Sequence, residues 1–170
     1  RRIRLLLSFH GRTSLEPATL RRRLVDRWTT RRADSLLTVS HEAAGLLREN
    51  LAIPGDKLTT IHNGVDTNLF FPAENDAEVS AIRQRLHIHP GADLVICVAN
   101  LLPIKGLDVL IRAWRQVCMA DPLARLLLVG DGPLRGELEE QVRESRCGNI
   151  IRFMGSREDV PLLLRAADVF

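Results

Sequence analysis

Two glycine-containing turns, each directly after a run of apolar residues, carry the side chains best suited to binding an anion. The first turn contains Asn100 and Lys105, and the second is Gly130-Asp131-Gly132-Pro133. In open α/β sheets, ligands bind at the carboxyl ends of parallel strands, where a following helix N-terminus favours negative charge. The chain holds only two lysines, so a lysine at this point does not come from a lysine-rich background. The spacing predicts a phosphate-bearing ligand with Lys105 as its cationic contact.

The glycine pattern alone is weak evidence for a ligand. Gly130, Gly132 and Gly136 are spaced so that Arg135 occupies the third glycine position of the dinucleotide fingerprint, and the sequence contains no P-loop pattern. We therefore predict no NAD site. Two interpretations of the turn stay open. It either contacts the ligand directly or only reverses the chain between a strand and a helix, with proline near the first helical position.

Histidines form a second set of candidates. His10 follows an apolar run, at a point where an α/β sheet would present it to a ligand, and imidazole can handle protons or a polar sugar near neutral pH. The alternative is an ordinary loop histidine. Ser40 and His41 do not form a hydrolase pair, because there is no G-x-S-x-G elbow. His87 and His89 lack a nearby carboxylate or cysteine at ligand spacing, so we predict no metal site there.

Elements that would position these residues follow from hydrophobic periodicity. Apolar residues recur at helical spacing after Gly106, whereas the short apolar runs rich in branched residues are typical of parallel strands covered on both faces. Ser40 is placed to cap a helix. The expected strands are 3–7, 35–39, 58–61, 94–98, 126–129 and 150–155, and the expected helices are 20–30, 41–50, 107–118 and 134–146, which together indicate repeated βαβ units in an α/β protein.

Charge is distributed unevenly along the chain. Residues 1–32 contain ten arginines and two acidic residues, a net charge of +8, whereas residues 33–170 carry −5. Such a basic segment attracts nucleic acid, anionic lipid or an acidic substrate. We predict no nucleic-acid partner, because aromatic residues make up 4% of the chain and none lies among these arginines as a stacking platform. A solvated helix face and contact with an anionic membrane surface both stay open.

Length and composition set further limits. A chain of 170 residues with 45% hydrophobic content can form one or two domains. Arg1 and Phe170 both look like cut ends, so we expect a piece of a longer protein. No apolar run reaches the ~18 residues of a membrane helix, and no signal peptide is recognisable, so a cytoplasmic location is the expectation. Cys97, Cys118 and Cys147 are predicted to be reduced core thiols.

Several motifs in order along the chain resemble the retaining glycosyltransferases of the GT4 family (glycosyl transferases group 1). The loop 8–12 (SFHGR) is similar to the family's acceptor-side loop. The other segments that carry the resemblance are 33–40 (ADSLLTVS), 61–66 (IHNGVD) with 70–72 (FFP), 98–106 (VANLLPIKG), 128–133 (LVGDGP), 153–155 (FMG) with 159–160 (DV), and 166–170 (AADVF).

The resemblance implies a GT-B fold with two facing Rossmann-like domains. On that basis residues 1–61 would be the C-terminal part of the acceptor-side domain, 62–75 an interdomain linker, and 76–170 the truncated donor-binding domain. The implied reaction is sugar transfer with retention from a nucleotide-sugar donor, such as a UDP- or GDP-sugar, without a required metal or other cofactor. The implied acceptor is a glycan, a lipid-linked sugar or a small molecule. The implied setting is synthesis of cell-envelope polysaccharide, in the cytoplasm or peripherally at the inner membrane face.

Site residues are also implied by the resemblance. Lys105 would bind the donor diphosphate, Gly130 and Gly132 would belong to the donor site, and the backbone of Met154 and Gly155 would line the nucleobase. His10 would lie near the transferred sugar and the acceptor. Asn100 stands where the family often has an arginine, so either donor affinity is lower or another cation compensates.

The family's donor-binding glutamate pair would lie beyond Phe170. The 170 residues alone are therefore expected to be inactive as a transferase. Two alternatives remain open, namely a nucleotide-sugar epimerase of similar fold and a non-catalytic nucleotide-binding or interaction module.

Overall fold

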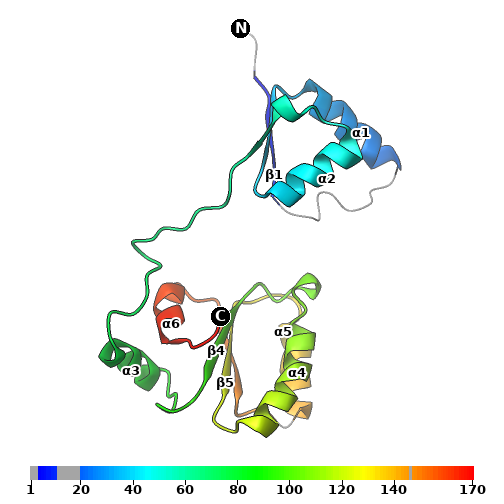
Figure 1. Ribbon diagram of the computed structural model, residues 1–170. Helices are drawn as coiled ribbons and strands as arrows, with labels where there is room; N and C mark the ends of the chain where they lie inside the picture. The colour runs from blue at the N-terminus through cyan, green and yellow to red at the C-terminus, as the bar shows by residue number, and fades with distance from the viewer. Residues whose placement is uncertain (1–3, 11–19, 146) are drawn as a thin grey trace. The chain divides into compact units, whose positions relative to one another are not determined.

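The computed structural model describes residues 4–10, 20–145 and 147–170 (Figure 1). The chain divides into two compact units, residues 1–65 and 66–170, and each contains one parallel three-stranded sheet. The predicted α/β class is confirmed. The first unit contains β1 (Leu6–Phe9), α1 (Leu20–Arg32), β2 (Ser35–Thr38), α2 (His41–Leu51), the 3-10 turn η2 (Gly55–Lys57) and β3 (Leu58–Thr60). The second contains α3 (Asp76–Arg85), β4 (Leu94–Val98), the 3-10 turn η3 (Pro103–Lys105), α4 (Leu107–Ala120), β5 (Arg125–Val129), α5 (Arg135–Glu144), β6 (Ile151–Gly155) and α6 (Val160–Ala166).

The sheet of the first unit has the strand order β1-β2-β3, with all neighbours parallel. Its core consists of Leu36 and Leu58 packed against Ala44, Leu47 and Leu51 of α2. The Ser40 hydroxyl accepts a hydrogen bond from the Ala43 amide at 3.1 Å, so the predicted helix cap is confirmed. Both helices lie on one side of this sheet in Figure 1. Because the three strands are parallel, their carboxyl ends lie at the same edge of the sheet.

The sheet of the second unit has the order β4-β5-β6, again parallel, with helices on both faces (Figure 1). Alternate residues of β5 enter two separate cores. Leu126 and Leu128 pack with α4 and α5, whereas Leu127 and Val129 pack with α3 and α6. Because both faces are covered, the strands read as continuous apolar runs rather than as alternating ones.

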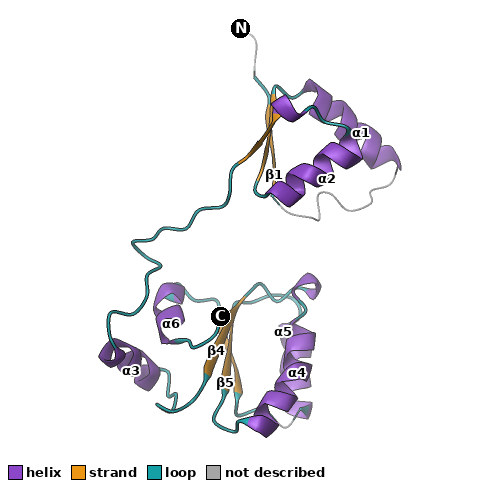
Figure 2. Cartoon of the chain, in the orientation of Figure 1, coloured by secondary structure: helices purple, strands orange, loops and turns teal. Residues whose placement is uncertain are grey.

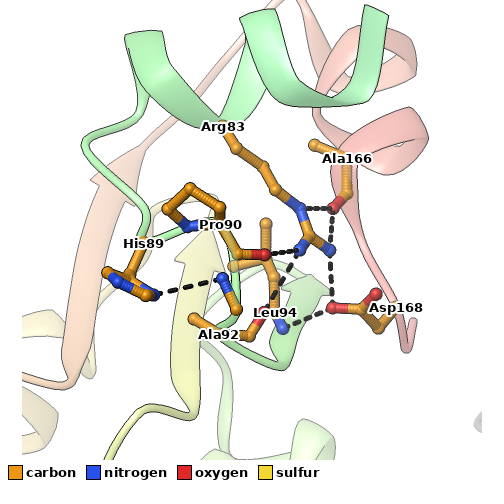
Figure 3. Close-up of polar contacts among 8 residues, drawn as sticks. Arg83, His89, Pro90, Ala92, Leu94, Ala166 and Asp168 are labelled. Atoms are coloured by element: carbon orange, nitrogen blue, oxygen red, sulfur yellow. Dashed lines mark hydrogen bonds and ion pairs between the residues drawn. The ribbon is translucent and has the colours of Figure 1, made fainter. Parts of the chain in front are cut away.

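Residues 168 and 169 lie along the free edge of β4, so this strand has a neighbour on each side. Val169 forms a parallel bridge with Val95, and the Leu94 amide donates to the Asp168 carboxylate at 2.7 Å. Figure 3 shows Arg83 of α3 holding this segment. Its guanidinium donates to the Ala166 carbonyl oxygen at 3.0 and 3.1 Å and pairs with Asp168 at 2.6 Å. The Arg83 side chain is only 11% exposed, so these contacts order the segment after α6.

Residues between β3 and α3 contain neither helix nor strand (Figure 2). The boundary between the two units, after Val65, falls inside the predicted linker 62–75. The later part of this loop is attached to the second unit, because the Arg165 guanidinium lies 3.6 Å from the Phe71 ring centre. None of the described helices is long and apolar enough to cross a lipid bilayer.

All three cysteines are free, as predicted. Cys118 and Cys147 are far apart in sequence, but the fold brings their sulfur atoms to 2.8 Å, with one thiol donating to the other. Burial, together with the neighbouring thiol, raises the pKa of Cys118 to about 11. Both side chains pack in or against the core beneath α4 and α5, so they act as apolar core residues.

Candidate functional site

A cavity of about 360 Å³ opens at the carboxyl edge of the second sheet. This is the position at which parallel α/β sheets bind ligands. Its walls come from the segments that follow β4, β5 and β6. The lining residues are Val98, Ala99, Asn100, Lys105, Val129, Gly130, Ser156, Arg157 and Val160. The structure thus brings together three of the predicted donor-site residues, namely Asn100, Lys105 and Gly130.

Lys105 is placed by a short 3-10 turn between β4 and α4. Pro103 starts the turn, and Gly106 ends it with a φ of 62°, a left-handed conformation that favours glycine. α4 begins at the next residue, Leu107, which is buried. The turn therefore fixes the backbone of Lys105 while its exposed side chain lines the cavity. Its positive charge also lowers the pKa of the Cys97 thiol, although burial has the larger effect and the pKa is raised overall.

Gly130 and Gly132 let two loops pack backbone against backbone. A Cβ on Gly130 would lie 2.0 Å from the Ala99 carbonyl oxygen, and one on Gly132 would lie 2.7 Å from that of Leu101. The Leu101 amide donates to the Asp131 carbonyl oxygen at 3.0 Å. The turn interpretation of these glycines is therefore supported. Gly130 also lines the cavity, whereas Gly132 is absent from its lining, so direct ligand contact by Gly132 stays a prediction.

Met154 and Gly155 lie at the end of β6, and neither lines the cavity. The Met154 side chain packs against the core on the α3 and α6 side. Gly155 has a φ of 69°, and its carbonyl oxygen accepts a hydrogen bond from the Gly130 amide at 2.8 Å. The strand ends of β5 and β6 are thereby joined. The role of the Met154 and Gly155 backbone beside a nucleobase stays a prediction.

A group of charged side chains forms ion pairs beside the carboxyl edge of the second sheet. Arg135 bonds Asp131 at 3.0 Å and Glu139 at 2.8 Å. The pKa of Asp131 is lowered, first by the Gly132 amide and then by Arg135. The Arg135 guanidinium also lies close to Gly155, 3.6 Å from where a Cβ would be. These contacts hold the start of α5 in place.

Ser156 and Arg157 are cavity residues that the sequence reasoning missed. They follow β6 directly, so the rule that placed Lys105 and Gly130 after β4 and β5 could have found them. Arg157 forms a two-pronged ion pair with Asp159, at 2.7 Å and 2.6 Å. This pair raises the pKa of Arg157 and lowers that of Asp159.

A second cavity, of about 290 Å³, lies at the carboxyl edge of the first sheet. His10 lines it after β1, and its Nε2 lies 2.7 Å from the Ser8 hydroxyl. Gly11 and Arg12 of the SFHGR motif lie outside the described residues. His62 lines the same cavity after β3, and its ring meets that of His41 edge-on at a centroid distance of 5.1 Å. In the sequence, His62 was identified only as part of the motif 61–66 and of the predicted linker, and the strand-end rule could have found it.

Among the residues that the structure describes, no group of three or more histidine, cysteine, aspartate or glutamate side chains could hold a metal ion. His89 accepts a hydrogen bond from the Gly91 amide at 3.1 Å (Figure 3). His87 has a φ of 54° in the loop before β4. Both histidines therefore belong to the structure of the loop between α3 and β4.

Two parallel α/β units, each with a cavity at the carboxyl edge of its sheet, define a Rossmann-like protein. In this class of protein, ligands bind at the strand ends. Residues 92–170 match the family described as Glycosyl transferases group 1, and residues 1–69 match Glycosyltransferase Family 4. The chain belongs to the group 1 (GT4) glycosyltransferases, and its fold matches part of the fold of the GT-B enzymes.

Curated relatives and a solved structure agree with this family. The chain is 36% identical over 110 residues to a GDP-mannose-dependent monoacylated alpha-(1-6)-phosphatidylinositol monomannoside mannosyltransferase of Corynebacterium glutamicum, covering 64% of this chain and 28% of that protein. It is 33% identical over 168 residues to a D-inositol 3-phosphate glycosyltransferase of Thermomonospora curvata, covering 91% of this chain and 38% of that protein.

The crystal structure of Anabaena HepE in complex with UDP and glucose matches with a TM-score of 0.82 and 26% identity, covering 98% of this chain and 45% of that one. The chain therefore spans less than half the length of each of these three proteins.

Proposed function

We propose that this chain is part of an enzyme that transfers a sugar, with retention of configuration, from a nucleotide-sugar donor to an acceptor hydroxyl. The observation that carries the proposal is the cavity at the carboxyl edge of the second sheet, with Lys105 in its wall. Relatives support the nature of the donor, because one is named for GDP-mannose and HepE was crystallised with UDP and glucose. We propose a UDP- or GDP-sugar as the donor.

In this reaction the second unit would bind the donor and stabilise the charge of the leaving group. In the transfer, the bond between the anomeric carbon and the diphosphate oxygen breaks, the acceptor oxygen bonds to the same face of that carbon, and the proton of the acceptor hydroxyl passes to the departing diphosphate oxygen. Negative charge then develops on the departing diphosphate. An ammonium group held at that point stabilises the charge more in the transition state than in the ground state. Lys105 is the residue that we propose for this role, and we propose that no metal is required.

The two units take different roles in this proposal. The first unit, with His10 in its strand-end cavity, would bind the acceptor, and the second would bind the donor. Residues 1–61, 62–75 and 76–170 would then be the acceptor-side part, the linker and the donor-binding part. The acceptor is a glycan, a lipid-linked sugar or a small polar molecule.

Replacing Lys105 tests the proposal. In the full-length protein that contains this chain, Lys105→Ala should weaken binding of UDP or GDP about tenfold to hundredfold, because a charge-assisted contact with phosphate contributes ~1.5–3 kcal/mol. Arg115→Ala is the matched control, since Arg115 is an exposed cation on α4 that does not line the cavity. Isothermal titration calorimetry measures both affinities. Equal affinities for the wild type and Lys105→Ala would remove Lys105 from the site.

The alternatives make different predictions in an activity assay. Incubation with a radiolabelled nucleotide sugar distinguishes transfer to an acceptor from conversion of the donor sugar to its epimer. A protein that binds the nucleotide but releases no labelled product over many hours would favour the non-catalytic module. The family assignment favours transfer over epimerisation, because both matching families are glycosyltransferases.

We also propose that α1 contacts an anionic membrane surface at the cytoplasmic face, in an enzyme of cell-envelope polysaccharide synthesis. Leu24, Val25 and Trp28 are exposed on this helix, and Trp28 is 57% exposed. Exposed arginines flank them, and the Arg32 guanidinium lies 3.8 Å from the Trp28 ring centre. Arginines attract anionic headgroups, and exposed apolar side chains beside them can enter the interfacial region. Relatives named for phosphatidylinositol and diacylglycerol glycosides support a lipid acceptor.

Vesicle sedimentation tests the membrane contact. The protein should sediment with vesicles containing anionic lipid and much less with neutral vesicles, and Trp28→Ala together with Arg31→Gln should reduce the bound fraction. Arg115→Gln serves as the control for loss of one exposed positive charge. Equal sedimentation with both vesicle types would contradict the proposal.

A further inference from the structure

Arg157 provides a second positive charge in the wall of the cavity that contains Lys105. It reaches the cavity from the loop between β6 and α6, whereas Lys105 comes from the loop between β4 and α4. Among the described residues that line this cavity, these two are the only lysine or arginine side chains, and Asn100 is neutral. We propose that Arg157 binds the diphosphate of the donor together with Lys105, which deepens and rests on the proposed function.

The donor geometry of Arg157 favours this pairing. Asp159 already balances the charge of Arg157, so Arg157 would act on a diphosphate mainly as a hydrogen-bond donor beside the charge of Lys105. A guanidinium suits the second position, because its planar array of donors matches phosphate oxygens and can form two parallel hydrogen bonds. Two cations on different loops would also hold the diphosphate from two directions, which restricts its position more than one contact could.

The ion pair with Asp159 prepares Arg157 for this role. The Nε and Nη2 atoms of Arg157 bond the two carboxylate oxygens at 2.7 and 2.6 Å, so the plane of the guanidinium is fixed before a ligand arrives. Within the part of the chain that the structure describes, Nη1 makes no hydrogen bond and is available to an oxygen in the cavity. Arg157 lines the cavity, whereas Asp159 does not.

A purely structural role is the competing explanation. The ion pair could serve only to hold the loop that leads into α6 in place. Removing either partner would then change ligand affinity by the same factor. The two partners can be changed separately to decide this. Arg157→Met removes the cation and the ion pair, whereas Asp159→Asn breaks the ion pair but keeps the guanidinium.

Calorimetry on the full-length protein that contains this chain tests the inference, with UDP, GDP and the matching nucleosides uridine and guanosine as probes. Arg157→Met should weaken the better-bound diphosphate about tenfold and leave the nucleoside affinity within about twofold of the wild type. Asp159→Asn should cost about threefold or less. Asn100 lines the same cavity, so Asn100→Arg in the Arg157→Met background should restore most of the lost affinity.

The outcomes separate this inference from the proposed function. If the wild type binds neither UDP nor GDP, both are overturned. If the wild type binds a diphosphate and Arg157→Met binds it equally well, only the role of Arg157 is overturned. The same holds if Arg157→Met and Asp159→Asn weaken diphosphate and nucleoside by equal factors, because that result would show that the pair only holds the loop in place.

Discussion

At the scale of single residues, the candidate donor site depends on positions where no side chain fits. Gly130 has a φ of 132°, and the Ala99 carbonyl oxygen occupies the space that its Cβ would need. The same close approach allows the Ala99 amide to donate to the Val129 carbonyl oxygen at 2.9 Å. Asn100 and Lys105 belong to the loop that this contact positions. These glycines therefore act on the site through the backbone.

Gly130→Ala should destabilise the second unit by about 2–4 kcal/mol. The new methyl group would collide with the backbone of Ala99, and the alanine would have to adopt a positive φ. Gly136→Ala is the matched control, since nothing lies within 4 Å of its would-be Cβ and it sits in the first turn of α5. That change should be neutral or stabilising by up to about 1 kcal/mol. Urea unfolding of variants that also carry Trp28→Phe, followed by the fluorescence of Trp114, which is 3% exposed, measures both. Equal effects of the two substitutions would contradict the steric argument.

At the scale of elements, Arg165 joins three segments that are far apart in sequence. From α6 it pairs with Glu78 of α3 at 2.9 Å and covers the Phe71 ring. The Arg165 side chain is only 16% exposed. The loop that follows Val65 is therefore attached to the second unit from Phe71 onward.

Arg165→Met should increase the rate of chymotrypsin cleavage after Leu69 or Phe70 about two- to tenfold, because loss of ~0.5–1.4 kcal/mol of attachment raises the population of the open loop. Arg112→Met is the control, since Arg112 forms a comparable but solvent-exposed pair with Asp108 on α4. Mass spectrometry of the early fragments identifies the cut. Identical cleavage rates in the two variants would show that Arg165 does not hold the loop.

At the scale of the whole molecule, acid should act on the second unit through a few paired carboxylates. The pKa values of Glu78, Asp131 and Asp159 are lowered, each by a backbone amide, an arginine or both, and all three residues lie in the second unit. A carboxyl whose pKa is lower in the folded state stabilises the fold above its unfolded value, about 4. That contribution is lost as the pH falls through the folded value.

The urea midpoint of the second unit should therefore fall as the pH is lowered from about 5 to about 3. Trp28→Phe leaves Trp114 as the only tryptophan and so reports on this unit alone. Adding Glu78→Gln should make the decrease shallower, because one of the three linked protons is removed. A midpoint that does not change over this range would contradict the linkage.

Sequence alone determined the elements and much of the site. Apolar periodicity predicted the six described strands and the helices α1, α2, α4 and α5 to within a few residues, whereas α3 and α6 were not predicted. The strands of the second sheet are covered on both faces, and α4 buries one apolar stripe. The cap at Ser40 and the turn at Lys105 and Gly106 follow from local chemistry. The motifs also resembled the right family, since their order along the chain does not depend on packing.

Tertiary structure decided which of these residues share a cavity. Asn100, Lys105 and Gly130 meet because β4 and β5 are parallel neighbours. Arg157 joins them because β6 is the next parallel strand, and its position after that strand is the one signal that the sequence offered. The thiols of Cys118 and Cys147 meet only because α4 and the segment after α5 enter one core. Sequence fixes what is local, since turns, caps and strands depend on near neighbours. Contacts across the sheet depend on strand order and register, which come from the burial of the whole core.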